Sequence, residues 1–121
     1  MKTHAIRIHS YGNASVLQWE EIELAAPGAG EALIRHRAVG LNFIDIYHRT
    51  GLYPVPQLPS VIGLEGAGIV EAVGPGVTEV KQGDRIAYAS TPIGAYAEAR
   101  NIPADRLVKL PETISDHQAA A

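Results

Sequence analysis

Glycine and proline divide this chain into short apolar runs, and that punctuation limits the folds open to it. The 121 residues include 12 glycines and 8 prolines, which fall between the runs. Glycine supplies turn conformations, and proline fixes the backbone and lacks an amide donor, so this spacing favours many short strands joined by tight turns. At this length we expect one domain, 1–121, around a single modest core.

The apolar runs predict a mainly β protein whose strands follow one another at hairpin-like spacing. In the first run apolar and polar residues alternate, and in the third Arg35 and Arg37 fall on one face, as in strands with one wet side. This pattern indicates a small antiparallel barrel or folded sheet. The predicted strands are Ala5–His9, Val16–Leu24, Ala32–Val39, Ile69–Val73, Val77–Val80, Arg85–Tyr88, Ala95–Ala99 and Leu107–Leu110.

The apolar period becomes helical between Asn42 and Thr50. Asn42 is a favourable N-cap because its side chain can accept a hydrogen bond from an unpaired helix N–H. Asp45 in the first turn and Arg49 in the last complement the helix dipole, and Gly51 suits the left-handed residue after the helix. The sequence therefore predicts a short helix from Asn42 to Thr50, followed by an extended loop that contains three prolines.

A second helix is predicted at the end of the sequence. Ser115 and Gln118 have the spacing of a capping box, and the alanines that follow are strong helix formers. The sequence ends within two turns of this start, at Ala121. We expect the helix to lead into a further element; the alternative is a frayed tail.

Charge and composition exclude several classes of partner. The net charge is −3 and no Lys/Arg run is present, so we expect no nucleic-acid partner. No apolar stretch approaches the ~20 residues of a membrane span, so we expect no membrane partner. The absence of cysteine excludes thiolate ligands within the chain and is compatible with the cytoplasmic location that we expect. The histidines lack metal-ligand spacing and are predicted to be surface or hydrogen-bonded residues: His4, His9, His36, His48 and His117.

The most distinctive stretch is the glycine-dense segment from Gly63 to Gly74, which by itself predicts a turn leading into a strand. It is not a dinucleotide-binding fingerprint, because that motif opens a helix. The segment resembles the Gly-His-Glu segment of the medium-chain dehydrogenase/reductase superfamily, although Leu64 replaces the histidine. That histidine binds zinc in the zinc-dependent members, and Asn42 stands near the position of their early cysteine ligand. The resemblance therefore points to the zinc-free branch, and we expect no bound metal.

Within that branch, the chain resembles NADPH:quinone oxidoreductases along its whole length. The segments that carry the resemblance are Val39–Tyr47, Arg49–Pro54, Gly83–Tyr88 and Gly94–Glu98. It implies a GroES-like, partly open antiparallel β-barrel with one or two short helices. It also implies that a Rossmann domain outside this chain binds most of the NADPH. The expected substrate is a quinone or another conjugated carbonyl compound.

The resemblance also implies roles for individual residues and a homodimeric full enzyme. The catalytic candidates are Asn42, Tyr47 and Tyr53, and the two tyrosines would flank the quinone. The cofactor side would consist of Asn42, Phe43, Ile44, Asp45, Ile46 and Tyr47. We expect the isolated chain to be inactive and to self-associate through surfaces that the full enzyme covers.

Each candidate also has a purely structural interpretation. Asn42 could be only a helix cap, and Asp45 could serve only to complement the helix dipole. Glu65 could serve only to accept hydrogen bonds from buried backbone donors. Tyr47 could be a core residue of the helix, and Tyr53 a loop aromatic. Two other functions also remain open: a zinc-free reductase of enones, enals or enoyl thioesters, and a free-standing GroES-like binding or oligomerising module without enzymatic activity.

Overall fold

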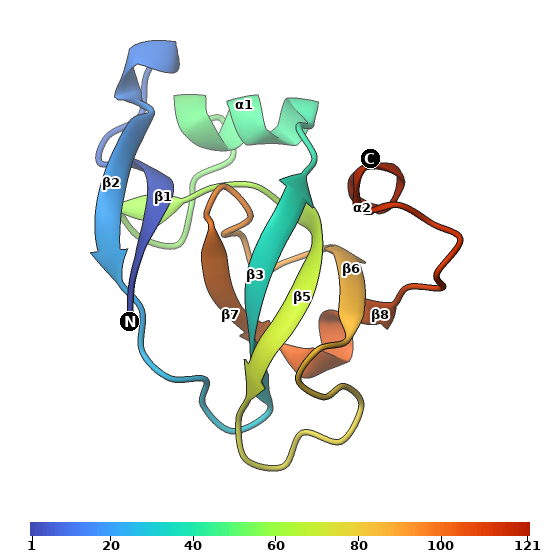
Figure 1. Cartoon of the computed structure of the whole chain (residues 1–121). Coiled ribbons are helices and arrows are strands. Elements are labelled where there is room, and N and C mark those ends of the chain that lie inside the picture. The colour runs from blue at the N-terminus through green and yellow to red at the C-terminus, as the bar shows by residue number, and fades with distance from the viewer.

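Two antiparallel sheets form the framework of the computed structural model, which describes residues 1–121 (Figure 1). A three-stranded sheet has the order β2-β1-β4, and a five-stranded sheet has the order β7-β3-β5-β6-β8. The strands are β1 (Lys2–Ile8), β2 (Gln18–Glu23), β3 (Glu31–Val39), β4 (Ser60–Val61), β5 (Glu65–Val73), β6 (Arg85–Ala89), β7 (Ala99–Pro103) and β8 (Val108–Lys109). The helices are α1 (Phe43–Thr50), α2 (Asp116–Ala120) and two 3₁₀ turns, Ala14–Val16 and Ala104–Arg106.

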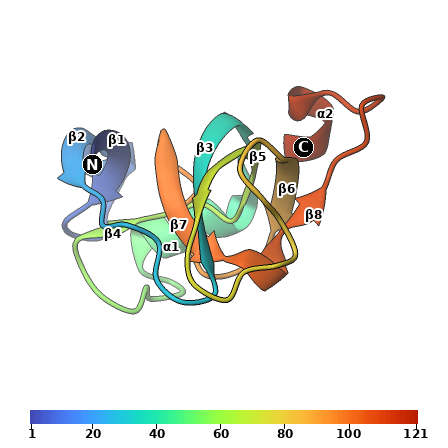
Figure 2. The same ribbon diagram turned by 60° about the horizontal axis from the view of Figure 1, so that its bottom comes forward.

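The segment before β7 joins the two sheets. Ala97 forms a single antiparallel bridge to Ala5 of β1. The amide of Glu98 donates to His4 O at 2.9 Å, and the Glu98 carbonyl accepts from the amide of His36 on β3 at 2.8 Å. Figure 2 shows β1 and β2 standing apart from the larger sheet. The sheets therefore make a partly open barrel, as predicted, because a bridge rather than a full ladder connects them.

The main core is formed largely by side chains from the strands of the five-stranded sheet. Ile34, Ile86 and Ile102 come from three different strands, and all are fully buried. A smaller cluster, with Ile8 and Ile62 at its centre, lies under the three-stranded sheet. Neither helix has the length and apolarity needed to cross a membrane.

The glycine-dense segment leads into a strand, as predicted, but the strand begins four residues earlier than expected, so its inner glycines do not form the predicted turn. Strand β5 begins at Glu65 and includes Gly66 and Gly68. A Cβ at Gly68 would lie 2.1 Å from Arg35 O, next to an irregular register between β3 and β5. Here glycine serves the close approach of two backbones rather than a reversal of the chain.

Two other strand predictions were also wrong. Val77–Val80 forms no strand: its backbone lies outside both sheets. The side chain of Val80 is nevertheless buried in the main core. Within Ala95–Ala99, only the single bridge at Ala97 precedes β7, which starts at Ala99. Val80 and Ala95 are buried in the main core without belonging to a strand.

Both predicted helices are present. Helix α1 has Asn42 as its N-cap and ends at Gly51, whose φ of 84° is left-handed. Helix α2 has the predicted capping box, in which Ser115 accepts from Gln118 N. It packs against β3, β5 and β6. Arg85 of β6 holds its start by donating to Ile114 O at 2.7 Å and to Asp116 at 3.1 Å.

Candidate functional site

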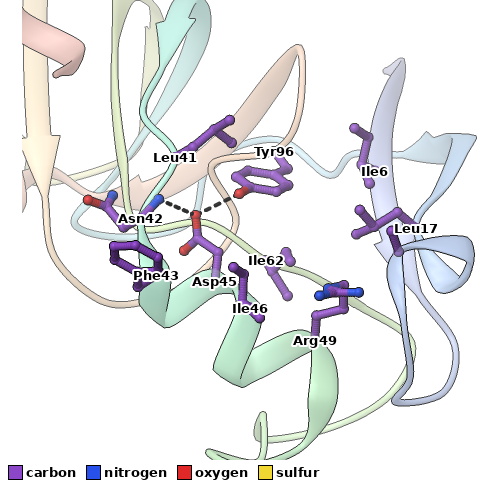
Figure 3. Close-up of a pocket in the computed structure, with 11 residues that line it drawn as sticks. Ile6, Leu17, Leu41, Asn42, Phe43, Asp45, Ile46, Arg49, Ile62 and Tyr96 are labelled. Atoms are coloured by element: carbon purple, nitrogen blue, oxygen red, sulfur yellow. Dashed lines mark hydrogen bonds between the residues drawn. The ribbon is translucent and has the colours of Figure 1, made fainter.

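A cavity of about 720 Å³ lies between α1, the three-stranded sheet and the segment around Tyr96 (Figure 3). Most of its lining is apolar, which favours an apolar small molecule as the ligand. The lining residues are Ile6, Ala14, Leu17, Leu41, Asn42, Phe43, Asp45, Ile46, Arg49, Ile62 and Tyr96.

One face of α1 supplies the helical wall of this cavity. Asn42, Asp45, Ile46 and Arg49 lie at positions i, i+3, i+4 and i+7, so they share a face. Phe43 borders the cavity beside them, with 80% of its surface exposed. The structure thus brings together four of the predicted cofactor-side residues: Asn42, Phe43, Asp45 and Ile46.

Asp45 is the centre of the polar contacts in the cavity. Its side chain is almost completely buried. Oδ2 accepts from the Asn42 amide at 3.1 Å and from the Tyr96 hydroxyl at 2.6 Å, whereas Oδ1 has no partner. Burial, together with the hydrogen bond to Asp45 and the charge there, raises the pKa of Tyr96 well above its usual value. The Tyr96 hydroxyl therefore keeps its proton at neutral pH and donates to Asp45. Asp45 does more than complement the helix dipole.

Asn42 is the predicted N-cap, and its side chain also reaches across to β5. Asn42 Nδ2 donates to Glu65 Oε2 at 3.1 Å. The alternative in which the Glu65 side chain serves only buried backbone donors is therefore wrong, because this carboxylate accepts from a side-chain amide. A Cβ at Gly40 would lie 2.2 Å from Glu65 Oε1 and 2.4 Å from the backbone oxygen of Ala120, so glycine at this position gives both groups room.

The two candidate tyrosines lie outside the cavity lining. Tyr47 and Tyr53 pack edge to face, with ring centroids 5.4 Å apart, and their exposed fractions are 37% and 52%. Tyr47 is therefore not a core residue of the helix. Tyr47 and Ile44 belong to other faces of α1, so the predicted site separates into a cavity and a neighbouring tyrosine pair.

Tyr96 is the main cavity residue that the sequence did not identify as a site residue. It lies 51 positions from Asp45, so no local pattern connects the two. The segment Gly94–Glu98 does belong to the family resemblance, and this was the available signal. A second hollow of about 530 Å³ adjoins the cavity, because the two share Ile6, Leu41 and Tyr96.

The histidines behave as predicted with one exception. The ring of His36 is hydrogen-bonded at both nitrogens, at 2.7 Å to Ala97 O and at 2.7 Å to the Tyr88 hydroxyl. His48 is the exception, because its Nδ1 is buried without a partner. No group of three or more His, Cys, Asp or Glu side chains is arranged to hold a metal ion.

Comparison with known proteins gives the family of the chain. Residues 28–112 match the model of the alcohol dehydrogenase GroES-like domain. A quinone oxidoreductase from Pseudomonas aeruginosa is 53% identical over 116 residues, which are 96% of this chain and 36% of that protein. A 2-haloacrylate reductase from a Burkholderia species is 42% identical over 88% of this chain and 33% of its own length.

A solved structure agrees with this match. The Escherichia coli quinone oxidoreductase complexed with NADPH superposes with a TM-score of 0.95 at 48% identity, covering 98% of this chain and 36% of that one. This chain thus spans about a third of the length of these relatives. Because the family model matches most of the chain, the protein belongs to the alcohol dehydrogenase GroES-like domain family of the medium-chain dehydrogenase/reductase superfamily.

Proposed function

We propose that this chain is the N-terminal, substrate-side domain of an NADPH-dependent quinone reductase that works without zinc. The observation that carries the proposal is the apolar cavity beside α1, in a chain about half identical to quinone oxidoreductases. When bound, NADPH supplies a hydride to the acceptor. The residues of this chain hold the reacting rings and exclude water around them.

The cavity fits the ring end of the cofactor better than its phosphates. Ile6, Ile46 and Ile62 provide apolar walls for a planar ring. Phosphates normally bind at a helix N-terminus with a glycine loop. In α1 the carboxylate of Asp45 already caps the N-terminus, and its negative charge opposes a phosphate there. The phosphates therefore require a part of the enzyme outside this chain.

The proposed roles follow from these positions. Asn42, Phe43, Asp45 and Ile46 contact the nicotinamide or quinone ring from the α1 side, and Ile44 supports the helix from another face. Tyr47 and Tyr53 form an aromatic edge beside the cavity. The acceptor enters along this edge, and the two rings contact the acceptor from the open side of the cavity.

The zinc-free assignment rests on two positions. Leu64 has a hydrocarbon side chain, and the amide of Asn42 is already bonded to Glu65 at 3.1 Å. Neither offers the imidazole or thiolate donor that zinc prefers. We also propose that the full enzyme is a cytoplasmic homodimer, without nucleic-acid or membrane partners, and that the isolated chain self-associates through its exposed apolar residues.

A second candidate is the reduction of another conjugated carbonyl compound. The observation that favours it is the 42% identity to a 2-haloacrylate reductase. An anionic acrylate would need a cation, and Arg49 lines the cavity. Both candidates use the same hydride chemistry and differ only in the acceptor.

The test is NADPH oxidation by the complete enzyme after exhaustive dialysis against a metal chelator. We expect rapid oxidation with a quinone, slower oxidation with 2-haloacrylates, and no change on adding zinc. Oxidation only with acrylates would favour the second candidate. Activity that is lost on dialysis and restored by zinc would contradict the zinc-free proposal, and no oxidation with any conjugated carbonyl would contradict both candidates.

A further inference from the structure

Asp45 lines the cavity beside α1, and one of its carboxylate oxygens, Oδ1, has no hydrogen-bond partner in the protein. The side chain is 3% exposed, and both donors that reach it bond to Oδ2. Oδ1 is buried and has none. A buried acceptor without a donor is unfavourable, and native proteins rarely keep one without a reason.

No neighbouring side chain of the cavity supplies the missing donor. Figure 3 shows Oδ1 turned away from Tyr96 and toward the side occupied by Phe43. The amide of Asn42 donates to Glu65, and the guanidinium of Arg49 donates to Gly12 O at 3.4 Å. No hydrogen bond joins Oδ1 to these or other side chains, so the cavity that Asp45 lines is the route by which a bound molecule could bring a donor to it.

We propose that Oδ1 of Asp45 determines specificity by accepting a hydrogen bond from a planar ring that carries an N–H or O–H donor. This inference rests on the proposed function, which offers two such groups: the hydroxyl of a hydroquinone and the carboxamide of the nicotinamide ring. A quinone carries only acceptor oxygens, and Oδ1 repels them. The cavity therefore orients its rings with a donor toward Asp45 and with acceptor oxygens away from it.

The test measures binding of matched small rings to this chain by NMR titration of the amides of Phe43–Ile46. One pair is 4-methoxyphenol and 1,4-dimethoxybenzene; the other is nicotinamide and N,N-diethylnicotinamide. In each pair only the first compound has a donor. We expect it to bind about tenfold more tightly, as one hydrogen bond to a charged group implies. The pair with the larger preference identifies whether the phenol or the carboxamide is the natural donor.

Asp45→Asn replaces one of the two acceptor oxygens by an amide nitrogen that donates, with little change in the shape of the side chain. The amide oxygen can still accept from Asn42 N and the Tyr96 hydroxyl, and the amide nitrogen replaces Oδ1. We expect the variant to lose the preference for the donor-bearing ring. Glu65→Gln is the matched control, because it also neutralises a carboxylate bonded to Asn42 but lies outside the cavity lining. It should keep the preference.

The outcomes separate this inference from the proposed function. Equal affinities within both pairs for the unmodified chain would overturn the inference alone, since rings would still bind. A preference that survives in Asp45→Asn would overturn it as well. If none of the four probes shifts these amides at tens of millimolar, the inference is overturned as well, and the proposed function is then decided by NADPH oxidation in the complete enzyme.

Discussion

His36 makes the stability of this fold depend on pH in a way that the structure specifies. Its Nδ1 lies 2.7 Å from a carbonyl oxygen, that of Ala97, so Nδ1 must carry the proton. In the neutral ring Nε2 then accepts from the Tyr88 hydroxyl, which in turn accepts from Arg100 at 3.3 Å. A second proton on His36 would point at the hydroxyl hydrogen of Tyr88, beside the charge of Arg100.

The size of the effect follows from the pKa. Burial lowers the pKa of His36 from 6.5 to about 4; the bond to Ala97 opposes this change and the charge of Arg100 reinforces it. Between these two values the unfolded chain binds a proton that the folded chain does not. The contribution of the neutral His36 to the free energy of unfolding is therefore fully present well above pH 6.5, and it is lost as the pH falls toward 4. From pH 8 to pH 5 the loss attributable to His36 is about 2 kcal/mol.

The assay is urea unfolding at pH 8 and pH 5 for the unmodified chain and for His36→Gln. Gln cannot titrate, so the variant should lose about 2 kcal/mol less over this pH range, whatever its own stability. His117→Gln, at an exposed position on α2, is the control and should keep the full pH dependence. NMR titration of the His36 ring gives a second measurement if the variant does not fold. A ring pKa above 6, or an unchanged pH dependence in His36→Gln, would show that burial of His36 does not cause the pH dependence.

Three further predictions concern other positions. Gly68→Ala should reduce the free energy of unfolding by at least about 3 kcal/mol, because the new Cβ meets the Arg35 carbonyl oxygen at 2.1 Å and both backbones must shift; a denaturation midpoint near that of the unmodified chain would argue against the close approach. Arg85→Met should speed hydrogen exchange of the α2 amides about tenfold, since the start of that helix loses its hydrogen bonds to Arg85; unchanged exchange would mean that packing alone holds α2. In the complete enzyme, Tyr53→Ala should lower quinone turnover about tenfold and change NADPH affinity little; the opposite split in steady-state kinetics would move Tyr53 to the cofactor side.

The sequence predicted α1 well because its signals are local. Asn42, Asp45 and Gly51 all lie within one short segment. Asn42 is the N-cap residue, Asp45 lies in the first turn and Gly51 is left-handed, as expected, although the Asn42 side chain donates to Glu65. The strand limits were less predictable. Apolar residues such as Val80 serve the core without joining a ladder, and the glycines of β5 permit close approach rather than a turn.

The candidate site was predictable only in part, because its walls come from distant segments. The Tyr96 hydroxyl bonds to Asp45, and Tyr96 itself lies next to the bridge residue Ala97 that joins the two sheets. No spacing in the sequence signals that contact. The separation of Tyr47 from the cavity could have been predicted, since Asp45 and Tyr47 differ by two positions and fall on different faces of a helix. The unpaired oxygen of Asp45 follows from three-dimensional packing and could not.

The most direct test of the account is to block the cavity in the complete enzyme. Ile46→Trp places a large ring among the lining residues, whereas Val108→Trp adds the same ring at an exposed position on β8. The measurement is kcat/KM for quinone-dependent oxidation of NADPH. We expect at least a tenfold loss for Ile46→Trp and an unchanged value for Val108→Trp. Full activity in a folded Ile46→Trp enzyme would show that the reacting rings do not occupy this cavity.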